Sequence, residues 1–350
     1  MIDEYTQEAD TLAPRHAKQS EIAKLAGVGI ATVDRVLNER GRVKEATRQR
    51  VLQAKKSIET GAQVQNRRKP WRLKVFLPEV AGPSTDFLGE CFQQFGERGN
   101  ATIECIFTTK MEPAVLARKL RSCEGQGIDA VAFQALEDQR VRDAVEHLKL
   151  RNIPCLALVS PLAHAPLIGF VGSDSRAGGR TAGLLMGLAC PQGGKVVVLS
   201  GGQLYRSHEY REMGFRAYLR SDCPHLEAIE TVSGQDDTTG NYDAILEVLD
   251  MHPEVVGIYN VGGGNEGVVR ALKEKSLTGE VKFIGHNLTG KTREYILDGA
   301  MQFIVHQNMQ LIAERAVNAM IARLEHREVQ ISSVPVEVIT RENLNDANWT

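Results

Sequence analysis

From Leu73 onward, short apolar runs alternate with amphipathic segments, and this alternation limits the possible folds more than any other feature of the sequence. Short runs rich in β-branched residues predict buried strands, and apolar residues spaced i, i+3, i+4 predict helices. Repeated strand–helix–strand order requires parallel sheets covered by helices on both faces. About ten strands are too many for one compact sheet here, so we expect two doubly wound lobes. Strands are expected at 73–78, 102–107, 130–133, 154–158, 195–199, 229–232, 255–260, 282–285 and 303–306, and helices at 87–96, 114–123, 138–150, 176–189, 210–220, 241–250, 267–275, 293–298 and 311–324.

Ligands of doubly wound sheets bind beyond the carboxyl ends of the strands. With two such lobes, both sets of strand ends can face one cleft. Glu79, Phe87 and Glu137 follow predicted strands in the first half of this region. We therefore expect these three side chains on one wall of a ligand cleft.

The stretch from Ser20 to Ala54 predicts three short helices with a tight turn between the first two. Ser20 can cap the first helix, and Gly27-Val28-Gly29 can end it, because glycine adopts the left-handed conformation without a Cβ clash. Helix, three-residue turn and helix form the helix-turn-helix arrangement, whose second helix enters the major groove of DNA. The buried stripes are expected to be Ile22, Leu25 and Ala26 on the first helix, Val33, Val36 and Leu37 on the second, and Val43, Ala46 and Val51 on the third.

The same region carries most of the positive charge. Residues 15–72 hold 15 Lys and Arg against 5 Asp and Glu, although the formal net charge of all 350 residues is −2. A basic end on a near-neutral chain provides an electrostatic surface for phosphates. Such contacts supply affinity without sequence information and weaken steeply with salt.

A family resemblance rests on the order and spacing of these residues. The strings Glu21-Ile22-Ala23, Ala26-Gly27-Val28, Thr32-Val33 and Arg35-Val36-Leu37-Asn38, followed by Val43 and Thr47-Arg48, closely resemble the headpiece of lac-repressor-type (LacI/GalR) bacterial transcription regulators. A small three-helix packing unit without DNA function is the alternative interpretation, but the basic charge favours the regulator.

The resemblance implies how the second helix would meet DNA. Ile30 and Ala31 stand where family members read bases, and apolar side chains there favour thymine methyl groups. Arg35 can bond guanine or phosphate. Asp34 departs from the family's small hydroxyl residue and would repel phosphate unless it meets a cytosine amino group or pairs with Arg48. The expected DNA-contacting residues are Ser20, Gly29, Ile30, Ala31, Thr32, Arg35, Asn38, Arg48, Arg67 and Arg68.

Four segments are expected along the chain: a tail at 1–17, the DNA-binding domain at 18–58, a hinge linker at 59–71 and an effector-binding domain at 72–350. In the family, the linker becomes a hinge helix that inserts a leucine into the minor groove. This linker has no leucine, and Val64 is its apolar candidate for insertion into the minor groove. The sequence therefore argues against leucine insertion by this linker. Arg67 and Arg68 could still read a narrow minor groove or contact phosphate.

Residues 72–340 resemble the periplasmic-binding-protein-like effector domain of the same family. The resemblance implies three crossings of the chain between the lobes. It assigns residues 72–171 and 302–330 to lobe one, and residues 173–301 with the C-terminal segment to lobe two. The alternating pattern alone does not give these crossings.

The resemblance also implies most of the effector site. Asp174 lies in the crossover segment, where either a helix cap or a ligand contact is expected. Arg211 matches an arginine that grips the effector and can present a planar fork to vicinal hydroxyls or a carboxylate. Asn260, with Asn265 behind it, and Gln307 match amides at strand ends. The expected effector-binding residues are Glu79, Phe87, Glu137, Asp174, Arg211, Asn260, Asn265, Asn287 and Gln307; Arg206 and His208 are weaker candidates in the loop before Arg211.

Two departures argue against a copy of ribose or glucose recognition. Asn287 stands where sugar binders often carry an aspartate, and Val159-Ser160 replace an Asp-Arg pair. His286, beside Asn287, is expected to be a neutral hydrogen-bonded histidine rather than a pH-sensitive contact.

Other functional classes fit less well. The glycines at 262–264 follow a strand as in a phosphate loop, but the Walker lysine is absent. No nucleophile elbow, zinc-protease motif or diagnostic acid pair predicts catalysis. The six cysteines lack Cys-x-x-Cys spacing and predict neither disulfides nor zinc. A solute-binding receptor without DNA function is the alternative, but the chain shows no secretory signal and no membrane-spanning run.

We therefore predict an α/β regulator with a helix-turn-helix headpiece. It is expected to be a cytoplasmic repressor that needs no cofactor and acts as a homodimer or homotetramer on double-stranded operator DNA. A sugar, polyol or derivative is the expected effector.

Overall fold

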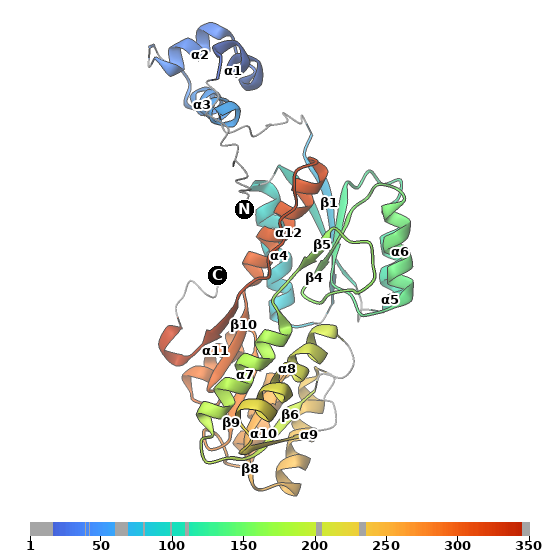
Figure 1. Cartoon of the computed structure of the whole chain (residues 1–350), viewed down its shortest axis with the longest axis vertical. Helices are drawn as coiled ribbons and strands as arrows, with labels where there is room; N and C mark the ends of the chain where they lie inside the picture. Colours follow the sequence, from blue (N-terminus) through green and yellow to red (C-terminus); the bar gives the residue numbers. More distant parts are fainter. Residues whose placement is uncertain are drawn as a thin grey trace, which may run out of the picture. The chain divides into compact units, whose positions relative to one another are not determined.

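The computed structural model describes residues 17–38, 40–41, 43–59, 69–79, 81–98, 100–108, 112–200, 205–230 and 236–344 (Figure 1). Contacts divide the chain into two compact units between Lys69 and Pro70. The predicted class, a helical headpiece followed by doubly wound parallel sheets, is confirmed.

The first unit contains three helices: α1 (Gln19–Ala26), α2 (Ile30–Leu37) and α3 (Glu45–Glu59). Gly27 ends α1 with a φ of 64°, in the left-handed region that glycine adopts freely. The predicted cap is wrong, because α1 starts one residue before Ser20 and its N-cap is Lys18. Ser20 is instead an exposed residue of the first turn.

A small core holds these helices together. The buried side chains come from all three, and the partly buried Leu37 and Val43 pack against them. The predicted stripes are confirmed where the side chains are described; those of Leu25 and Ala46 lie outside the described set. The buried residues are Ile22, Ala23, Ala26, Val33, Val36, Val51 and Ala54.

The second unit contains two sheets. The first has the order β2-β1-β3-β4-β5, and all of its pairs are parallel. Its strands are β1 (Trp71–Pro78), β2 (Ala101–Thr108), β3 (Ala130–Phe133), β4 (Cys155–Leu158) and β5 (Gly169–Val171), and the helices between them are α4 (Pro83–Arg98), α5 (Pro113–Arg121) and α6 (Gln139–Lys149).

The second sheet has the order β11-β10-β9-β8-β6-β7, parallel except for the edge strand β11. Its strands are β6 (Gly194–Leu199), β7 (Leu226–Glu230), β8 (Val255–Asn260), β9 (Lys282–His286), β10 (Phe303–Gln307) and β11 (Val336–Ile339). Its helices are α7 (Ser175–Ala189), α8 (Arg206–Asp222), α9 (Thr238–Met251), α10 (Asn265–Glu274) and α11 (Gly290–Leu297).

Both faces of each sheet are buried, which explains the continuous apolar runs of the strands. Successive residues of a strand point to opposite faces. Val75 therefore packs with Phe92 of α4, whereas Phe76 packs in a separate core with Leu116 of α5. In the second sheet, α9, α10 and α11 cover one face and α7 and α8 the other.

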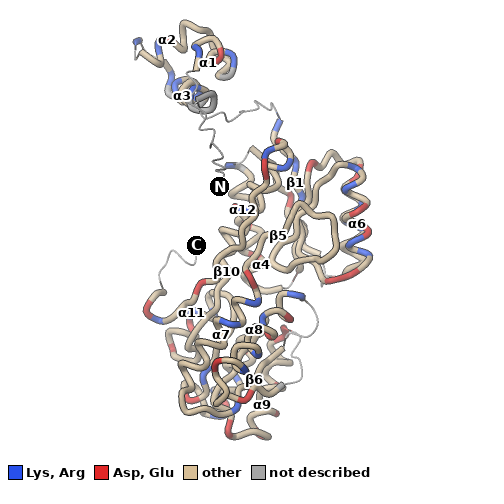
Figure 2. Tube along the Cα trace, viewed as in Figure 1, with Lys and Arg blue, Asp and Glu red and all other residues tan. Residues whose placement is uncertain are grey.

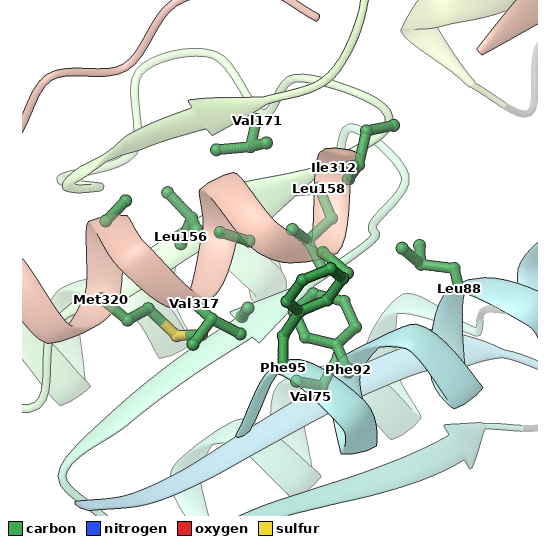
Figure 3. Packing of buried hydrophobic residues seen from close by; sticks show 14 of the residues in the cluster. Val75, Leu88, Phe92, Phe95, Leu156, Leu158, Val171, Ile312, Val317 and Met320 are labelled. Atoms are coloured by element: carbon green, nitrogen blue, oxygen red, sulfur yellow. The ribbon is translucent and has the colours of Figure 1, made fainter. Parts of the chain in front are cut away.

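The last long helix, α12 (Met309–Leu324), returns to the first sheet. Ile312, Val317 and Met320 pack there against α4 and the strands β3 to β5 (Figure 3). The chain then re-enters the second sheet as β11. One predicted boundary is wrong: residues 303–307, expected in lobe one, form β10 and pair with β9 in the second sheet. The chain therefore changes lobe between β10 and α12.

Candidate functional site

In the headpiece, α2 presents one face to solvent. Val33 and Val36 are buried, whereas Ile30 is 55% exposed and Ala31 and Arg35 are also exposed. An exposed isoleucine on an otherwise polar surface is available for contact with a partner. Of the other predicted DNA residues, Gly29 and Asn38 are exposed and Thr32 and Arg48 are half-buried; Arg67 and Arg68 lie outside the described residues.

Asp34, the acidic residue of α2 that departs from the family pattern, has a hydrogen-bond partner within the headpiece. The side-chain amide of Asn38 donates to Oδ1 of Asp34 at 2.7 Å, an i, i+4 contact on the helix surface. The expected partners were Arg48 or a cytosine. The hydrogen bond orients the carboxylate along the exposed face instead of leaving it to meet phosphate alone.

Basic side chains dominate the rest of this surface. Figure 2 shows Lys and Arg along all three helices with few acids between them. The described and exposed cations of the first unit include Lys18, Lys24, Arg35, Arg40, Lys44 and Arg50.

In the second unit, the predicted arginine is deeply buried. Arg211 is 4% exposed, and its Nη1 donates to the carbonyl oxygen of Val261 at 2.6 Å. Burial lowers the pKa of this guanidinium, although the nearby Asp236 opposes the shift. Val261 directly follows β8, so Arg211 lies at the carboxyl end of the second sheet.

Close contact between two helix backbones sets the position of Arg211. A Cβ atom on Gly179 of α7 would lie 1.9 Å from the carbonyl oxygen of Arg211. A Cβ on Gly214 of α8 would lie 2.2 Å from the carbonyl oxygen of Arg176. Only glycine permits this approach, which presses the first half of α8 against α7.

The amides at the end of β8 form a network. Nδ2 of Asn260 donates to Oδ1 of Asn265 at 2.8 Å and to the carbonyl oxygen of Gly263 at 2.6 Å. Nδ2 of Asn265 donates in turn to the carbonyl oxygen of His286 at 3.3 Å. The two predicted asparagines are therefore brought together, and they join the carboxyl ends of β8 and β9.

A second pair of predicted residues meets beside this network. Nε2 of Gln307 donates to Oδ1 of Asn287 at 3.4 Å, and Nδ2 of Asn287 donates to Oγ of Ser84 at 3.4 Å. Gln307 is 3% exposed, and its Oε1 has no hydrogen-bond partner. A buried acceptor without a donor is destabilising, and a ligand hydroxyl would satisfy it.

The carboxylate of Glu137 is hydrogen-bonded to groups of the protein. It accepts from Nη1 of Arg142 and from the backbone N–H of Ala163, both at 2.7 Å. Its Oε1 also lies 3.4 Å from Nη1 of Arg206, which belongs to α8 of the other lobe. Glu137 therefore links the lobes by an ion pair.

Two further contacts cross between the lobes. The backbone N–H of Ser207 donates to Oγ of Ser160 at 3.4 Å, and Asn287 reaches Ser84 as described above. All the groups involved lie beyond strand ends or in the first turns of helices. The carboxyl ends of the two sheets therefore face each other, as the sequence predicted.

Three predicted residues are not linked to this set by any hydrogen bond or ion pair among the described side chains. Asp174 is exposed and caps α7, accepting from the N–H of Ala177 at 2.9 Å. Glu79 is exposed at the end of β1, and Phe87 packs against the first lobe's core. The cap expected at Asp174 is confirmed, and its ligand contact, which does not exclude a cap, stays a prediction.

Of the histidines near the strand ends, His286 and His306 are buried and His208 is half-buried. Burial lowers the pKa of His208 to about 4, with Asp236 opposing the shift and Arg211 adding to it. His286 faces the hydroxyl of Tyr259, with Nε2 and the tyrosine oxygen 2.8 Å apart, and burial lowers its pKa well below the ordinary value. The neutral, hydrogen-bonded state predicted for His286 agrees with this geometry.

Sequence reasoning missed several polar residues of the same region. Gln134 follows β3, is 6% exposed and leaves its Oε1 without a partner. Ser160 follows β4, and Asp236 accepts from the N–H of Gly263 at 2.9 Å. For Gln134 the available signal was a polar residue directly after a buried strand.

Within the described ranges, no group of three or more His, Cys, Asp or Glu side chains is placed to hold a metal ion. No helix in those ranges is both long and apolar enough to cross a bilayer.

Comparison with known sequences matches both units. Residues 20–59 match the bacterial regulatory proteins of the lacI family, and residues 82–328 match the periplasmic binding protein domain. The chain therefore belongs to the periplasmic binding protein domain family and carries a lacI-family regulatory region at residues 20–59. The first match contains the helix-turn-helix. The second contains every strand of both sheets except β1 and β11.

Curated relatives of this chain include a regulator and sugar-binding proteins. The HTH-type transcriptional regulator DegA of Bacillus subtilis is 25% identical over 48% of this chain and 51% of its own length. The ribose import binding protein RbsB of Salmonella typhimurium is 20% identical over 67% of this chain and 78% of its own. The chain thus spans about half the length of the regulator that it matches.

Solved structures show the same two-lobed fold. An ABC transporter solute-binding protein from Burkholderia graminis, in complex with D-arabinose, has a TM-score of 0.75 at 20% identity and covers 79% of this chain and 98% of its own. GanP, a glucose-galactose binding protein from Geobacillus stearothermophilus, has a TM-score of 0.74 at 16% identity over 79% and 99%. At these identities the likeness concerns the fold.

Proposed function

We propose that this chain is a transcription repressor whose affinity for operator DNA is controlled by a sugar, polyol or derivative bound between its two lobes. The observation that carries the proposal is the joining, in one chain, of a lacI-family headpiece with an exposed α2 face and a periplasmic-binding-protein domain. As a DNA-binding protein of a bacterium, it would act in the cytoplasm.

In the headpiece, the exposed face of α2 would enter the major groove. Ile30 and Ala31 would contact thymine methyl groups, and Arg35 would bond a guanine or a phosphate. The surrounding lysines and arginines would neutralise phosphates without reading sequence. Asp34, oriented by Asn38, is the side chain on this face suited to accept from a cytosine amino group.

In the second unit, the effector would bind among Arg211, Asn260, Asn287 and Gln307. The unpartnered Oε1 of Gln307 supports this placement, since a ligand hydroxyl can donate to it. Effector binding would shift the equilibrium between arrangements of the two lobes, which the ion pair between Glu137 and Arg206 joins in this structure. A coupling of about 1–3 kcal/mol between the two sites is typical of such allostery.

A two-fold symmetric assembly would match a pseudo-palindromic operator, with one headpiece in each half-site about one helical turn apart. Sedimentation of the full chain should therefore give a mass of at least two copies of 38.5 kDa. If the protein sediments as a single copy both free and bound to DNA, the dimer is removed from the proposal.

The function is tested by selecting genomic fragments with the full-length protein at low ionic strength, with and without candidate sugars and polyols. We expect retention of a few sequences, a steep loss of retention with salt, and a change in retention when the effector is added. Reporter expression from the retained promoter should rise when the protein is deleted. Failure to retain any fragment would refute the proposal.

The alternative, a solute-binding receptor without DNA function, agrees with the fold of the solute-binding proteins. It predicts that a sugar raises the melting temperature while no DNA fragment is retained. The same experiment therefore separates the two functions.

A further inference from the structure

Two cations of the described chain are more than nine-tenths buried, and they differ in their partners. Lys74 is 8% exposed; its Nζ lies 3.3 Å from a carboxylate oxygen of Glu104 and donates to Oε1 of Gln126 at 2.6 Å. Arg211 is 4% exposed and donates to one neutral group, the carbonyl oxygen of Val261. A buried charge is strongly destabilising unless an opposite charge compensates it.

The carboxylates nearest Arg211 serve other groups. Asp236 accepts from the N–H of Gly263 and faces Nδ1 of His208 at 3.6 Å. Glu212, the next residue along α8, accepts from Nε of Arg216 at 2.9 Å. No ion pair joins either acid to Arg211 in the described structure, and none of the described Asp or Glu residues is nine-tenths buried.

The sequence adds no acid to this region either. Residues 201–204 and 231–235, the segments that follow β6 and β7, read Gly-Gly-Gln-Leu and Thr-Val-Ser-Gly-Gln. Neither contains Asp or Glu. Asp236, the residue after the second segment, accepts from the N–H of Gly263 and forms no ion pair with Arg211 in the described structure.

A second cation lies one turn earlier on the same helix. Nη1 of Arg206 lies 3.4 Å from Glu137, but that carboxylate already accepts from Arg142 and the N–H of Ala163 at 2.7 Å. Nε of Arg206 is buried without a hydrogen-bond partner. Arg142 and Arg206 both contact Glu137, whereas Arg211 forms no ion pair with Glu137 or Asp236 in the described structure.

Two of the other unsatisfied buried atoms at the strand ends are amide oxygens, which need donors. Oε1 of Gln134 in the first lobe and Oε1 of Gln307 in the second are both buried and without partners. A hydroxyl is a donor that can satisfy an amide oxygen. The site therefore offers acceptors for hydroxyl groups and a cation for a negative group.

Building on the proposed function, we infer that the effector is an anionic sugar derivative whose negative group pairs with Arg211. Its hydroxyl groups donate to the amide oxygens of Gln134 and Gln307. A carboxylate or a phosphate ester supplies the negative group, and the planar guanidinium binds either in a two-pronged contact.

The test is a thermal-shift and calorimetric screen of the full-length protein against matched sets of pentoses and hexoses. Each set contains the neutral sugar, its sugar acid and its phosphate ester, with inorganic phosphate and sodium chloride as ionic controls. We expect the largest shift from an anion, and the acid and ester arms show which negative group is preferred. A largest shift from a neutral sugar, or no shift from any compound, overturns the inference.

Variants of Arg211 test the charge itself. Arg211→Met should weaken the anionic probe by about 100-fold or more and its neutral counterpart by about tenfold or less. Arg211→Lys should retain part of the preference for the anion, because the charge remains while the planar fork is lost. Arg220→Met, an exposed position of the same helix, is the matched control and should leave binding unchanged. Equal losses for acid and neutral sugar in Arg211→Met would also overturn the inference.

DNA retention is measured separately. If the protein retains operator DNA and responds to a neutral sugar, the proposed function stands and the anionic effector is wrong. If no DNA is retained, the proposed function fails, whatever compound binds.

Discussion

Replacing Gly179 by alanine should move the arginine at the centre of the candidate site. The added Cβ would lie 1.9 Å from the carbonyl oxygen of Arg211. A comfortable contact between carbon and a carbonyl oxygen requires about 3.3 Å. The backbones of α7 and α8 must therefore separate locally by roughly 1.4 Å, the difference between these distances.

The adjacent glycine provides the control. A Cβ on Gly178 would meet Cγ1 of Val305 at 3.7 Å and Cγ2 of Val336 at 3.8 Å, both ordinary contacts. Alanine stabilises a helix by about 0.8–1 kcal/mol relative to glycine, so Gly178→Ala should be neutral or stabilising. In Gly179→Ala the same gain is opposed by overpacking of about 1–3 kcal/mol or more. The two variants should differ in free energy of unfolding by about 1–3 kcal/mol.

The two variants are compared by urea unfolding and by effector titration of the full-length protein. Gly179→Ala should unfold at lower urea and bind the effector at least about tenfold more weakly, because a binding group must lie within about 0.5 Å of its working position. Gly178→Ala should bind normally. Equal stability and equal affinity in the two variants would show that the contact between α7 and α8 does not position Arg211.

Three further predictions concern other residues. Arg35→Ala should reduce operator retention by about tenfold or more while effector affinity stays unchanged, and parallel loss of both would contradict separate modules; Arg121→Ala, in α5, is its control. Gln307→Leu should change the melting temperature of the ligand-free protein little, because removal of a buried acceptor without a donor offsets loss of the 3.4 Å contact from Nε2 to Asn287. It should abolish the effector-induced shift, and a retained shift would remove this residue from the site. His208 has a pKa of about 4 in the folded protein, below its ordinary value of about 6.5, so the unfolded chain binds the extra proton first and stability should fall as pH decreases from about 6.5 to about 4. Urea unfolding at several pH values should show a shallower fall in His208→Asn, and an unchanged slope would contradict the burial of a neutral ring.

Much of the fold could be predicted because the central strands of the two sheets are buried on both faces and therefore form continuous apolar runs. The two strands that were missed lack this signal. β5 has three residues, and β11 is an antiparallel edge strand whose residues are mostly half-buried. Helix starts were placed too late where the first turn is polar, as in α8, which begins at Arg206 rather than at Tyr210.

The site was predictable to a smaller extent. The family resemblance predicted Asn260 and Gln307 as site residues, and both lie at the carboxyl ends of strands. The partners of Glu137 were not predictable, because Arg206 reaches it from a helix some 70 positions away in sequence, in the other lobe. The burial of Arg211 depends on glycines of α7, and no local pattern around Arg211 shows it.

The passage from β10 to α12 contains a single residue, Asn308. Its side chain accepts from the N–H of Leu311 in α12 and donates to Glu337 of β11 at 3.2 Å. These two hydrogen bonds connect the start of the helix to the edge strand. Gln307 on one side belongs to the second sheet, and Met309 on the other is buried in the first lobe's core. The proposed effector, bound to Gln307, would therefore contact the residue directly before the point at which the chain passes from one lobe to the other.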